Sequence, residues 1–144
     1  MLEIFNKLCD EISQVIEIDE IALLKIQDGY IIPVIKKNTE FLSADEWFDF
    51  HEEYESKVEN DKFIKRTLEE KKVSVIKDTS NLEEVPIEWK VLGIASIYFF
   101  PVIKDDKVVS IVDIAYIKKP YKMTDEQIEK LKEIISKYSN ELEI

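Results

Sequence analysis

Several residue types that carry chemistry are nearly absent from this sequence of 144 residues. Cys9 is the only cysteine and His51 the only histidine, so one chain holds neither a cysteine pair nor a multi-histidine metal site. Gly29 and Gly93 are the only glycines, which excludes a glycine-rich phosphate loop. Arg66 is the only arginine, and a dedicated phosphate clamp favours arginine forks. We therefore expect no metal site and no nucleotide-phosphate site.

Basic residues are outnumbered by acidic ones, 20 to 31, and long apolar runs are scarce. The formal net charge of −11 opposes phosphate backbones, so we expect no nucleic-acid partner. No apolar run approaches the roughly 20 residues that span a membrane, and the N-terminal MLEIFNKLCDEI lacks the basic region of a signal peptide. We therefore expect a cytoplasmic protein with no membrane partner. A hydrophobic content of 45% and a charged content of 35% are typical of a single globular domain, here 1–144.

The first pair of apolar runs predicts a hairpin. Runs 20–27 and 30–37 flank Asp28-Gly29, which is the strongest short signal for a β-hairpin. Pro33 in the second run has no N–H to donate to a ladder. That strand should therefore lie at a sheet edge or carry a bulge at Pro33.

A second hairpin is predicted near the C-terminus. Runs 94–104 and 107–119 flank Asp105-Asp106 and are apolar on both alternating faces. Strands of this kind lie in the middle of a sheet that is covered on both sides. Residues 73–78 form a fifth, shorter strand.

Helical spacing of apolar residues predicts a helix at each end of the chain and short helices in the middle. Ser43 and Thr124 each begin a capping-box pattern, and Gly93 should end the helix before the second hairpin. The whole pattern is an α+β domain with a mainly antiparallel sheet. We expect the terminal helices to pack together on one face and the middle segment to cover the other. The predicted helices are 2–17, a short helix after Ser43, 61–72, 87–93, and one from Thr124 to Ile144.

The order of these elements resembles a GAF domain over nearly the full chain. The sharpest match is FFPVIKDDKVVSIVDIA, where Pro101-Val102, the Asp105-Asp106 turn and the small residue Ser110 follow the family pattern. Asp78 fits the aspartate that often follows the third strand. The resemblance implies a GAF/PAS-like antiparallel sheet of five or six strands in the order 2-1-5-4-3. It also implies a small-molecule sensor module of signalling proteins.

The sequence departs from the specialised members of that family. Sulfoxide-reducing and bilin-binding GAF domains use cysteines that are missing here, and Cys9 lies in a predicted helix as a buried hydrophobe. Asn60-Asp61-Lys62-Phe63 does not reproduce the extended pattern of cyclic-nucleotide GAF domains. A PAS domain is the nearest rival architecture, but it lacks two long flanking helices. The cofactor, if there is one, stays unknown, and no catalytic residue is predicted.

Asp113 is the most unusual residue, because it interrupts the apolar strand KVVSIVDIAY. An unpaired carboxylate in such a strand is costly. Asp113 is either a pocket-facing acceptor for an amine, hydroxyl or cation of a ligand, or a structural carboxylate that pairs with a lysine or a backbone N–H. Strand alternation places its side chain on the same face as Val109, Ile111 and Ala115.

The second predicted hairpin and the segment before it supply further candidate ligand-binding residues. Tyr98 and Phe100 share one face of their strand, where they line a pocket or fill the core, and Phe99 takes the other face. Trp89 precedes this strand, where GAF domains often build a pocket lid. Asp78 is either a turn cap or a ligand contact.

The middle segment holds an aromatic cluster that is either core or pocket wall. Helical spacing places Trp47, Phe50, His51 and Tyr54 on one stripe. Trp47 and His51 are the candidate ligand contacts from this cluster. A lone axial His51 on a haem is an alternative.

We expect a non-enzymatic regulatory domain that binds a small molecule between the sheet and the middle segment and signals through the terminal helices. The alternative is a dimerisation module with a collapsed pocket, in which stripes 2–16 and 128–142 pair across a two-fold axis. An enzyme of the sulfoxide-reductase type is disfavoured by the cysteine count. The last helix is predicted to run to Ile144 without a glycine stop, as if an output domain, such as a kinase or a diguanylate cyclase, followed it or acted in trans.

Overall fold

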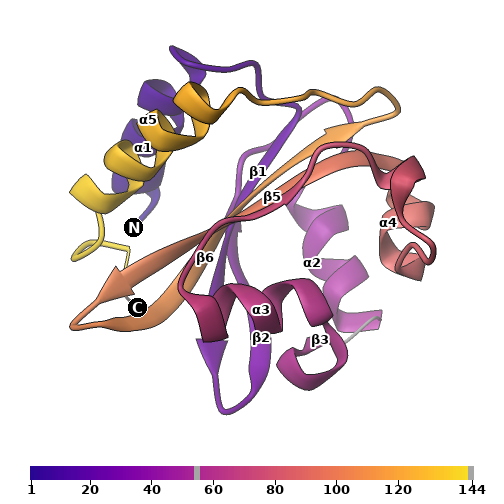
Figure 1. The fold of residues 1–144 in the computed structure, drawn as a ribbon, viewed down its shortest axis with the longest axis horizontal. Coiled ribbons are helices and arrows are strands. Elements are labelled where there is room, and N and C mark those ends of the chain that lie inside the picture. Colours follow the sequence, from indigo (N-terminus) through magenta and orange to yellow (C-terminus); the bar gives the residue numbers. More distant parts are fainter. Residues whose placement is uncertain (54–55, 143–144) are drawn as a thin grey trace.

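The computed structural model describes residues 1–53 and 56–142, which form a sheet with helices on both faces (Figure 1). In chain order the helices and strands are α1 (Leu2–Ser13), β1 (Glu20–Gln27), β2 (Tyr30–Lys36), α2 (Ala44–Glu53), β3 (Ser56–Lys57), the 3-10 turn η1 (Val58–Asn60), α3 (Lys62–Glu70), β4 (Ser74–Ile76), the 3-10 turn η2 (Thr79–Asn81), α4 (Ile87–Leu92), β5 (Ile94–Lys104), β6 (Lys107–Ile117) and α5 (Asp125–Lys137).

The described strands form one antiparallel sheet in the order β3-β2-β1-β6-β5-β4. The predicted order 2-1-5-4-3 is confirmed for the five predicted strands. The short strand β3 was not predicted and pairs with β2 at only two positions, Tyr30 with Lys57 and Ile31 with Ser56. The long strands β5 and β6 are central, as their apolar character predicted.

The first hairpin turns at Asp28 and Gly29, whose φ angles are 52° and 80°. Both residues are in the left-handed region that a two-residue hairpin turn requires. The pairing passes from Leu23 with Ile35 to Leu24 with Pro33, so Val34 is an extra residue in β2. The predicted irregularity at this proline is therefore confirmed as a β-bulge.

The second hairpin also contains a bulge, which the sequence did not reveal. Asp105 and Asp106 form its turn with φ angles of 51° and 63°. The pairing then passes from Ile103 with Val108 to Val102 with Ser110, so Val109 has no opposite residue. In a regular hairpin Ser110 would pair with Pro101 of β5, but here it pairs with Val102. The bulge thus shifts the pairing of the following residues by one position.

The terminal helices α1 and α5 lie side by side on one face of the sheet (Figure 1), as predicted. Their apolar stripes are buried against β5 and β6. The Tyr116 hydroxyl donates to the Glu17 carbonyl at 2.6 Å, and this bond ties β6 to the segment after α1. The buried stripe residues are Phe5, Leu8, Cys9 and Ile12 in α1 and Ile128, Leu131, Ile134 and Ile135 in α5.

The last helix is shorter than predicted. Helix α5 begins with the predicted capping box of Thr124 and Gln127 but ends at Lys137. The chain then turns back, and the Ser110 hydroxyl donates to the Leu142 carbonyl at 3.0 Å. The Leu142 side chain is buried in the core, and this apolar contact ends the helix without a glycine. The predicted end at Ile144 lies outside the described residues.

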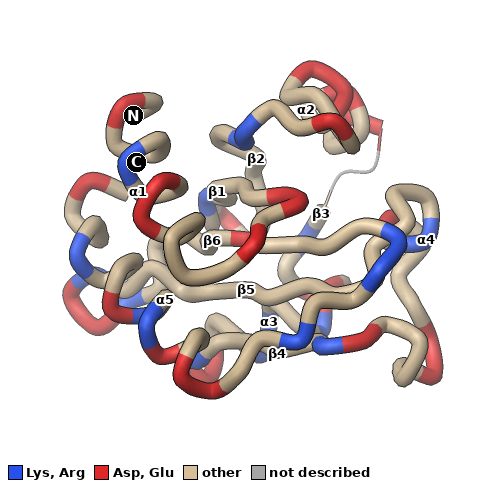
Figure 2. The backbone as a smooth tube through the Cα atoms, turned by 90° about the horizontal axis from the view of Figure 1, so that it is seen from above, with Lys and Arg blue, Asp and Glu red and all other residues tan. Residues whose placement is uncertain are grey.

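Helices α2, α3 and α4 cover the opposite face of the sheet, as predicted (Figure 1). The Ser43 capping box is confirmed by bonds in both directions between Ser43 and Glu46. Gly93 ends α4 with a φ of 72°. Acidic and basic residues are mixed over the outer helices and turns, while β5 crosses the middle without charge (Figure 2).

None of the helices in the described ranges combines the length and the apolar character that crossing a membrane requires.

Candidate functional site

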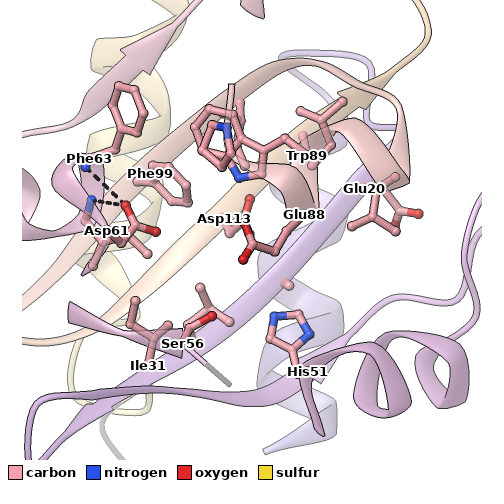
Figure 3. Close-up of a pocket in the computed structure, with 18 of the residues that line it drawn as sticks. Glu20, Ile31, His51, Ser56, Asp61, Phe63, Glu88, Trp89, Phe99 and Asp113 are labelled. Atoms are coloured by element: carbon pink, nitrogen blue, oxygen red, sulfur yellow. Dashed lines mark hydrogen bonds between the residues drawn. The ribbon is translucent and has the colours of Figure 1, made fainter. Parts of the chain in front are cut away.

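A cavity of about 490 Å³ lies between the sheet and the middle segment. Strands β1, β2, β5 and β6 supply its floor, and helices α2, α3 and α4 with their adjoining turns supply its walls (Figure 3). Its inner polar side chains are Glu20, Lys36, His51, Asp61, Glu88 and Asp113. Its apolar side chains include Ala22, Leu24, Ile31, Trp47, Phe63, Trp89, Ile97, Phe99 and Ala115.

Asp113 lies on the floor of this cavity, in the middle of β6, where it pairs with Ala22 of β1 and Phe99 of β5. Its Oδ1 atom is buried and has no hydrogen-bond partner among the described residues. Burial raises the pKa of this carboxyl to about 7, and repulsion from Glu20 and Asp61 adds to the shift, which Lys36 opposes. Asp113 therefore sits near the midpoint of its titration at neutral pH.

Glu20 and Lys36 form a buried ion pair at one side of the cavity. The Lys36 ammonium donates to Glu20 Oε2 and also to the Lys37 carbonyl, at 2.8 Å. The Thr39 hydroxyl donates to Glu20 Oε1 at 2.7 Å. Burial raises the pKa of Glu20 in spite of these bonds. The only inner ammonium of the described lining is thus already bound to a carboxylate of this chain.

Asp61 serves both a helix and the cavity. Its Oδ1 accepts the backbone N–H groups of Phe63 and Ile64 at 3.1 and 3.0 Å, which caps the N-terminus of α3. Burial raises the pKa of Asp61, and the nearby Glu88 carboxylate raises it further. In the described part of the chain, no hydrogen bond engages the second oxygen, Oδ2.

His51 projects from α2 into the cavity (Figure 3). Its Nδ1 lies 2.8 Å from the Trp47 carbonyl, which can only accept, so Nδ1 carries the proton. Burial lowers the pKa of His51. The ring is therefore neutral at pH 7, with Nε2 as a hydrogen-bond acceptor.

Aromatic rings form two walls of the cavity. Trp89 stacks on Phe63 with ring centroids 5.1 Å apart and lies 6.2 Å from Phe99. Trp47 contacts the His51 ring edge-on at 4.8 Å. Both tryptophans are buried. Flat apolar walls around a few fixed polar groups are typical of small-molecule sites.

A family model described as the GAF domain matches residues 1–142 of this sequence. The chain belongs to the GAF domain family. GAF domains occur as sensor modules in signalling proteins such as histidine kinases and cyanobacteriochromes. The comparison with curated proteins gave no match.

Solved structures share the fold of this GAF domain at low sequence identity. A GAF/HD domain protein from Geobacter sulfurreducens has a TM-score of 0.79 at 12% identity, over 97% of this chain and 90% of that chain. The PixJ GAF domain of Thermosynechococcus elongatus has a TM-score of 0.76 at 15% identity, with coverages of 98% and 83%. A domain of a sensor histidine kinase from Sinorhizobium meliloti has a TM-score of 0.73 at 14% identity, with coverages of 99% and 90%.

The GAF domain cavity brings together four of the predicted ligand-binding residues, Asp113, Trp89, Trp47 and His51. Phe50 also lines it, and Tyr54 lies outside the described residues. His51 Nε2 faces the cavity, but four inner carboxylates are a poor environment for the propionates of a haem. The lining therefore does not fit a haem.

Tyr98 and Phe100 do not line this cavity, which corrects their predicted role in it. Both side chains lie on the opposite face of β5, in the core beneath α1 and α5. The Tyr98 hydroxyl donates to the Tyr121 carbonyl at 2.6 Å and accepts the Met123 N–H at 2.9 Å. Phe99 faces the cavity in their place. The bulge at Val109 likewise turns Val109 away from the face of Asp113, so the predicted grouping of the two residues was wrong.

Asp78 also lies outside the cavity lining. Its Oδ1 accepts the Ser80 N–H at 2.9 Å and the Ser80 hydroxyl at 2.6 Å, which caps η2. These hydrogen bonds lower the pKa of Asp78. Of the two roles predicted for this residue, the structure places it in the turn cap.

Sequence reasoning missed most of the acidic lining. Glu20, Asp61 and Glu88 are three of many acidic residues, and only their placement separates them from surface charges. Asp61 carries one usable signal, since it stands directly before a helical stripe as an N-cap. Lys36 also carries a signal. It stands at a position of its strand where alternation predicts an inward-facing apolar residue, and a buried lysine needs an anion beside it.

Proposed function

We propose that this GAF domain is a non-enzymatic, ligand-sensing regulatory domain that binds a small molecule in the cavity between its sheet and its middle segment. The observation that supports this most is the open cavity of about 490 Å³ with the unpaired Oδ1 of Asp113 on its floor. A buried carboxylate oxygen without a partner is costly for the fold alone, and a donor group bound at the Asp113 carboxylate would lower that cost.

Strand β6 connects the cavity to the terminal helices in this proposal. Asp113 faces the cavity, and Ser110 and Tyr116 of the same strand bond to Leu142 and Glu17 on the helical face. A ligand that shifts β6 would therefore change the contacts that hold both ends of the chain. An output domain, such as a kinase or a diguanylate cyclase, would read that change in the same cytoplasmic protein or in trans.

The single cysteine supports a role without thiol chemistry. Cys9 is a buried residue of α1, in the core on the face of the sheet that is opposite the cavity. Burial raises the pKa of its thiol to about 11. The thiolate that a sulfoxide-reducing reaction would need is thus scarce and remote from the cavity.

A homodimer through the terminal helices is less well supported than ligand binding. The apolar stripes that were expected to pair across a two-fold axis are buried within this chain, since Phe5, Leu8, Ile12 and Leu131 have 0% exposure. They are not free for a bundle with a second copy. Leu2, at 62% exposure, is an exposed apolar residue of α1.

Native mass spectrometry of the purified domain, followed by a denatured run, tests the proposed function. We expect a non-covalent adduct that disappears on denaturation and that Ala115→Leu, which fills the cavity floor, abolishes. Ala44→Leu is the matched control, because Ala44 opens α2 outside the cavity lining. An adduct that survives Ala115→Leu would contradict the proposed site, and a dimer without any adduct would favour the dimerisation module.

A further inference from the structure

We propose that the ligand of this cavity is an organic amine, bound as a cation with its ammonium group on Asp113 and its apolar body between the aromatic walls. This inference deepens the proposed function and rests on it, since it names the ligand class of the same site.

The carboxylates and the imidazole of the inner cavity present acceptors, and the indoles of Trp47 and Trp89 are its uncharged N–H donors. Asp113 Oδ1 has no partner in the described ranges, and His51 Nε2 is an acceptor because Nδ1 donates to Trp47. Asp61 offers Oδ2, and Glu88 adds a carboxylate within electrostatic reach of His51 and Asp61. A ligand that bonds to these carboxylates and to His51 must therefore bring donors, and an ammonium brings up to three donors and no acceptor.

The charge of the inner lining selects a cation. Four carboxylates, those of Glu20, Asp61, Glu88 and Asp113, face one ammonium, that of Lys36. Lys36 is bound to Glu20 and to a backbone carbonyl, so it is not free to receive an anionic ligand. The other lysines of the described lining, Lys57 and Lys62, have exposed side chains and lie over the rings of Tyr30 and Phe63. A carboxylate or phosphate ligand would meet repulsion with no inner counter-charge.

The aromatic walls of the cavity suit the apolar body of an organic amine. Trp89 stacked on Phe63, with Phe99 beside them, gives a flat apolar wall. Trp47 lines the cavity from α2. Aromatic faces also attract cations, so the groups that hold the apolar body do not oppose the ammonium. Aliphatic side chains from the sheet close the floor around Asp113.

Three indoles that differ only in their head group test the ligand class, namely tryptamine, indole-3-ethanol and indole-3-propionate, with hexylamine as a second amine. We expect tryptamine to bind most tightly, measured by calorimetry at neutral pH. Asp113→Asn keeps the shape and removes the charge, and it should weaken tryptamine binding about tenfold to hundredfold. Asp105→Asn is the matched control with the same charge change, in the exposed hairpin turn, and should leave the affinity unchanged.

The pH dependence gives a second readout. A cationic ligand prefers the ionised Asp113, so its affinity should rise between pH 6.5 and 8 and level off above the pKa of about 7. The groups around Asp113 are Glu20 from β1, Lys36 from β2, and Asp61, His51 and Glu88 from the walls. The pH dependence should be absent in Asp113→Asn.

The outcomes separate the ligand class from the proposed function. Tighter binding of the alcohol or the acid than of tryptamine would overturn the amine and leave the sensor standing. Tryptamine binding that Asp113→Asn does not weaken would also overturn it. If both amines fail at millimolar concentration while native mass spectrometry still shows an adduct, only the ligand class is wrong. If every probe fails and no adduct appears, both proposals fall.

Discussion

At the scale of single residues, the cavity is defined by carboxylates that the fold holds away from water. Asp113 lacks a partner in the described part of the chain, Glu20 has one in Lys36, and Asp61 has one in a helix N-terminus. A buried carboxyl group is thus accommodated in three ways: by a raised pKa at Asp113, by an ion pair at Glu20 and by a helix cap at Asp61. The shifted pKa and the ion pair each make a separate prediction.

Asp113 should make the domain less stable as the pH rises. Its pKa is about 7 when folded and 3.8 ordinarily, so between these values the folded state keeps a proton that the unfolded state has lost. The free energy of unfolding therefore falls from about pH 4 to pH 7 and is level above. Asp113→Asn removes the titrating group. Its free energy of unfolding should exceed that of the wild type by roughly 1 to 4 kcal/mol at pH 8, and should differ little at pH 4.

Urea unfolding of both proteins at the two pH values checks this prediction. Asp105→Asn controls for the change in net charge, because Asp105 lies exposed in the turn. A stability difference between Asp113→Asn and the wild type that is the same at pH 4 and pH 8 would contradict the shifted pKa.

The Glu20–Lys36 pair should be costly to break from one side. The side chains are only 11% and 2% exposed, so Lys36→Met leaves a buried carboxylate with Thr39 as its remaining side-chain partner. We expect a loss of about 3 to 5 kcal/mol. The double variant Glu20→Gln with Lys36→Met should recover much of it, because no charge is then left unpaired. Urea unfolding of the four proteins of this cycle measures the coupling, and additive losses would show that the pair is not coupled.

At the scale of elements, local signals in the sequence decide where helices begin and where hairpins turn. Two capping boxes, an Asp-Gly turn and the helix-ending Gly93 are all in place. Where an element ends against the core, the local signal was not sufficient. Helix α5 ends at Lys137 because Leu142 turns back into the core and its carbonyl accepts from Ser110.

The capping box of α5 gives a prediction for one element. Thr124→Ala removes the bond from the Gln127 N–H to the Thr124 hydroxyl, 3.1 Å long, and should cost about 1 kcal/mol of the free energy of unfolding. Thr124→Ser keeps the hydroxyl and should stay within a few tenths of the wild type. Equal losses in the two variants, measured by urea unfolding, would show that the cap is not what matters at this position.

At the scale of the whole molecule, the sheet separates the cavity and helices α2, α3 and α4 on one face from helices α1 and α5 on the other. Strand β6 touches both, through Asp113 on one side and Ser110 on the other. Helix α5 and the turn after it pack on the side away from the cavity (Figure 1). A signal from the cavity to this end of the chain thus has a short path through one strand.

Ser110→Ala tests that path. It removes the buried hydroxyl that holds the Leu142 carbonyl and should cost about 1 to 3 kcal/mol, mostly by loosening 138–142. In hydrogen exchange, tryptamine should protect both the middle segment and 138–142 in the wild type. In Ser110→Ala it should protect only the middle segment. Protection of 138–142 that persists in the variant would mean that the coupling takes another route.

The bulge at Val109 explains which candidate residues the sequence placed wrongly. A regular hairpin that continues the pairing of Lys104 with Lys107 would set Tyr98 opposite Asp113. The extra residue shifts the pairing by one, so Phe99 stands opposite Asp113 and faces the cavity with it. No local feature of the run of valines and isoleucines announces the bulge, because its position depends on how both faces of the sheet pack.

By itself, the sequence determined the family, the strand order, the two hairpin turns and the unusual character of Asp113. The hairpin turns and the character of Asp113 depend on periodicity and turn chemistry, which act over a few residues, and the family and the strand order were implied by the resemblance to GAF domains. Only the tertiary structure decided which acids face the cavity, that Lys36 is taken by Glu20, and that Tyr98 and Phe100 belong to the helical core. Those outcomes depend on strand register and on contacts between distant segments, and a one-residue shift in register exchanges the two faces of a strand.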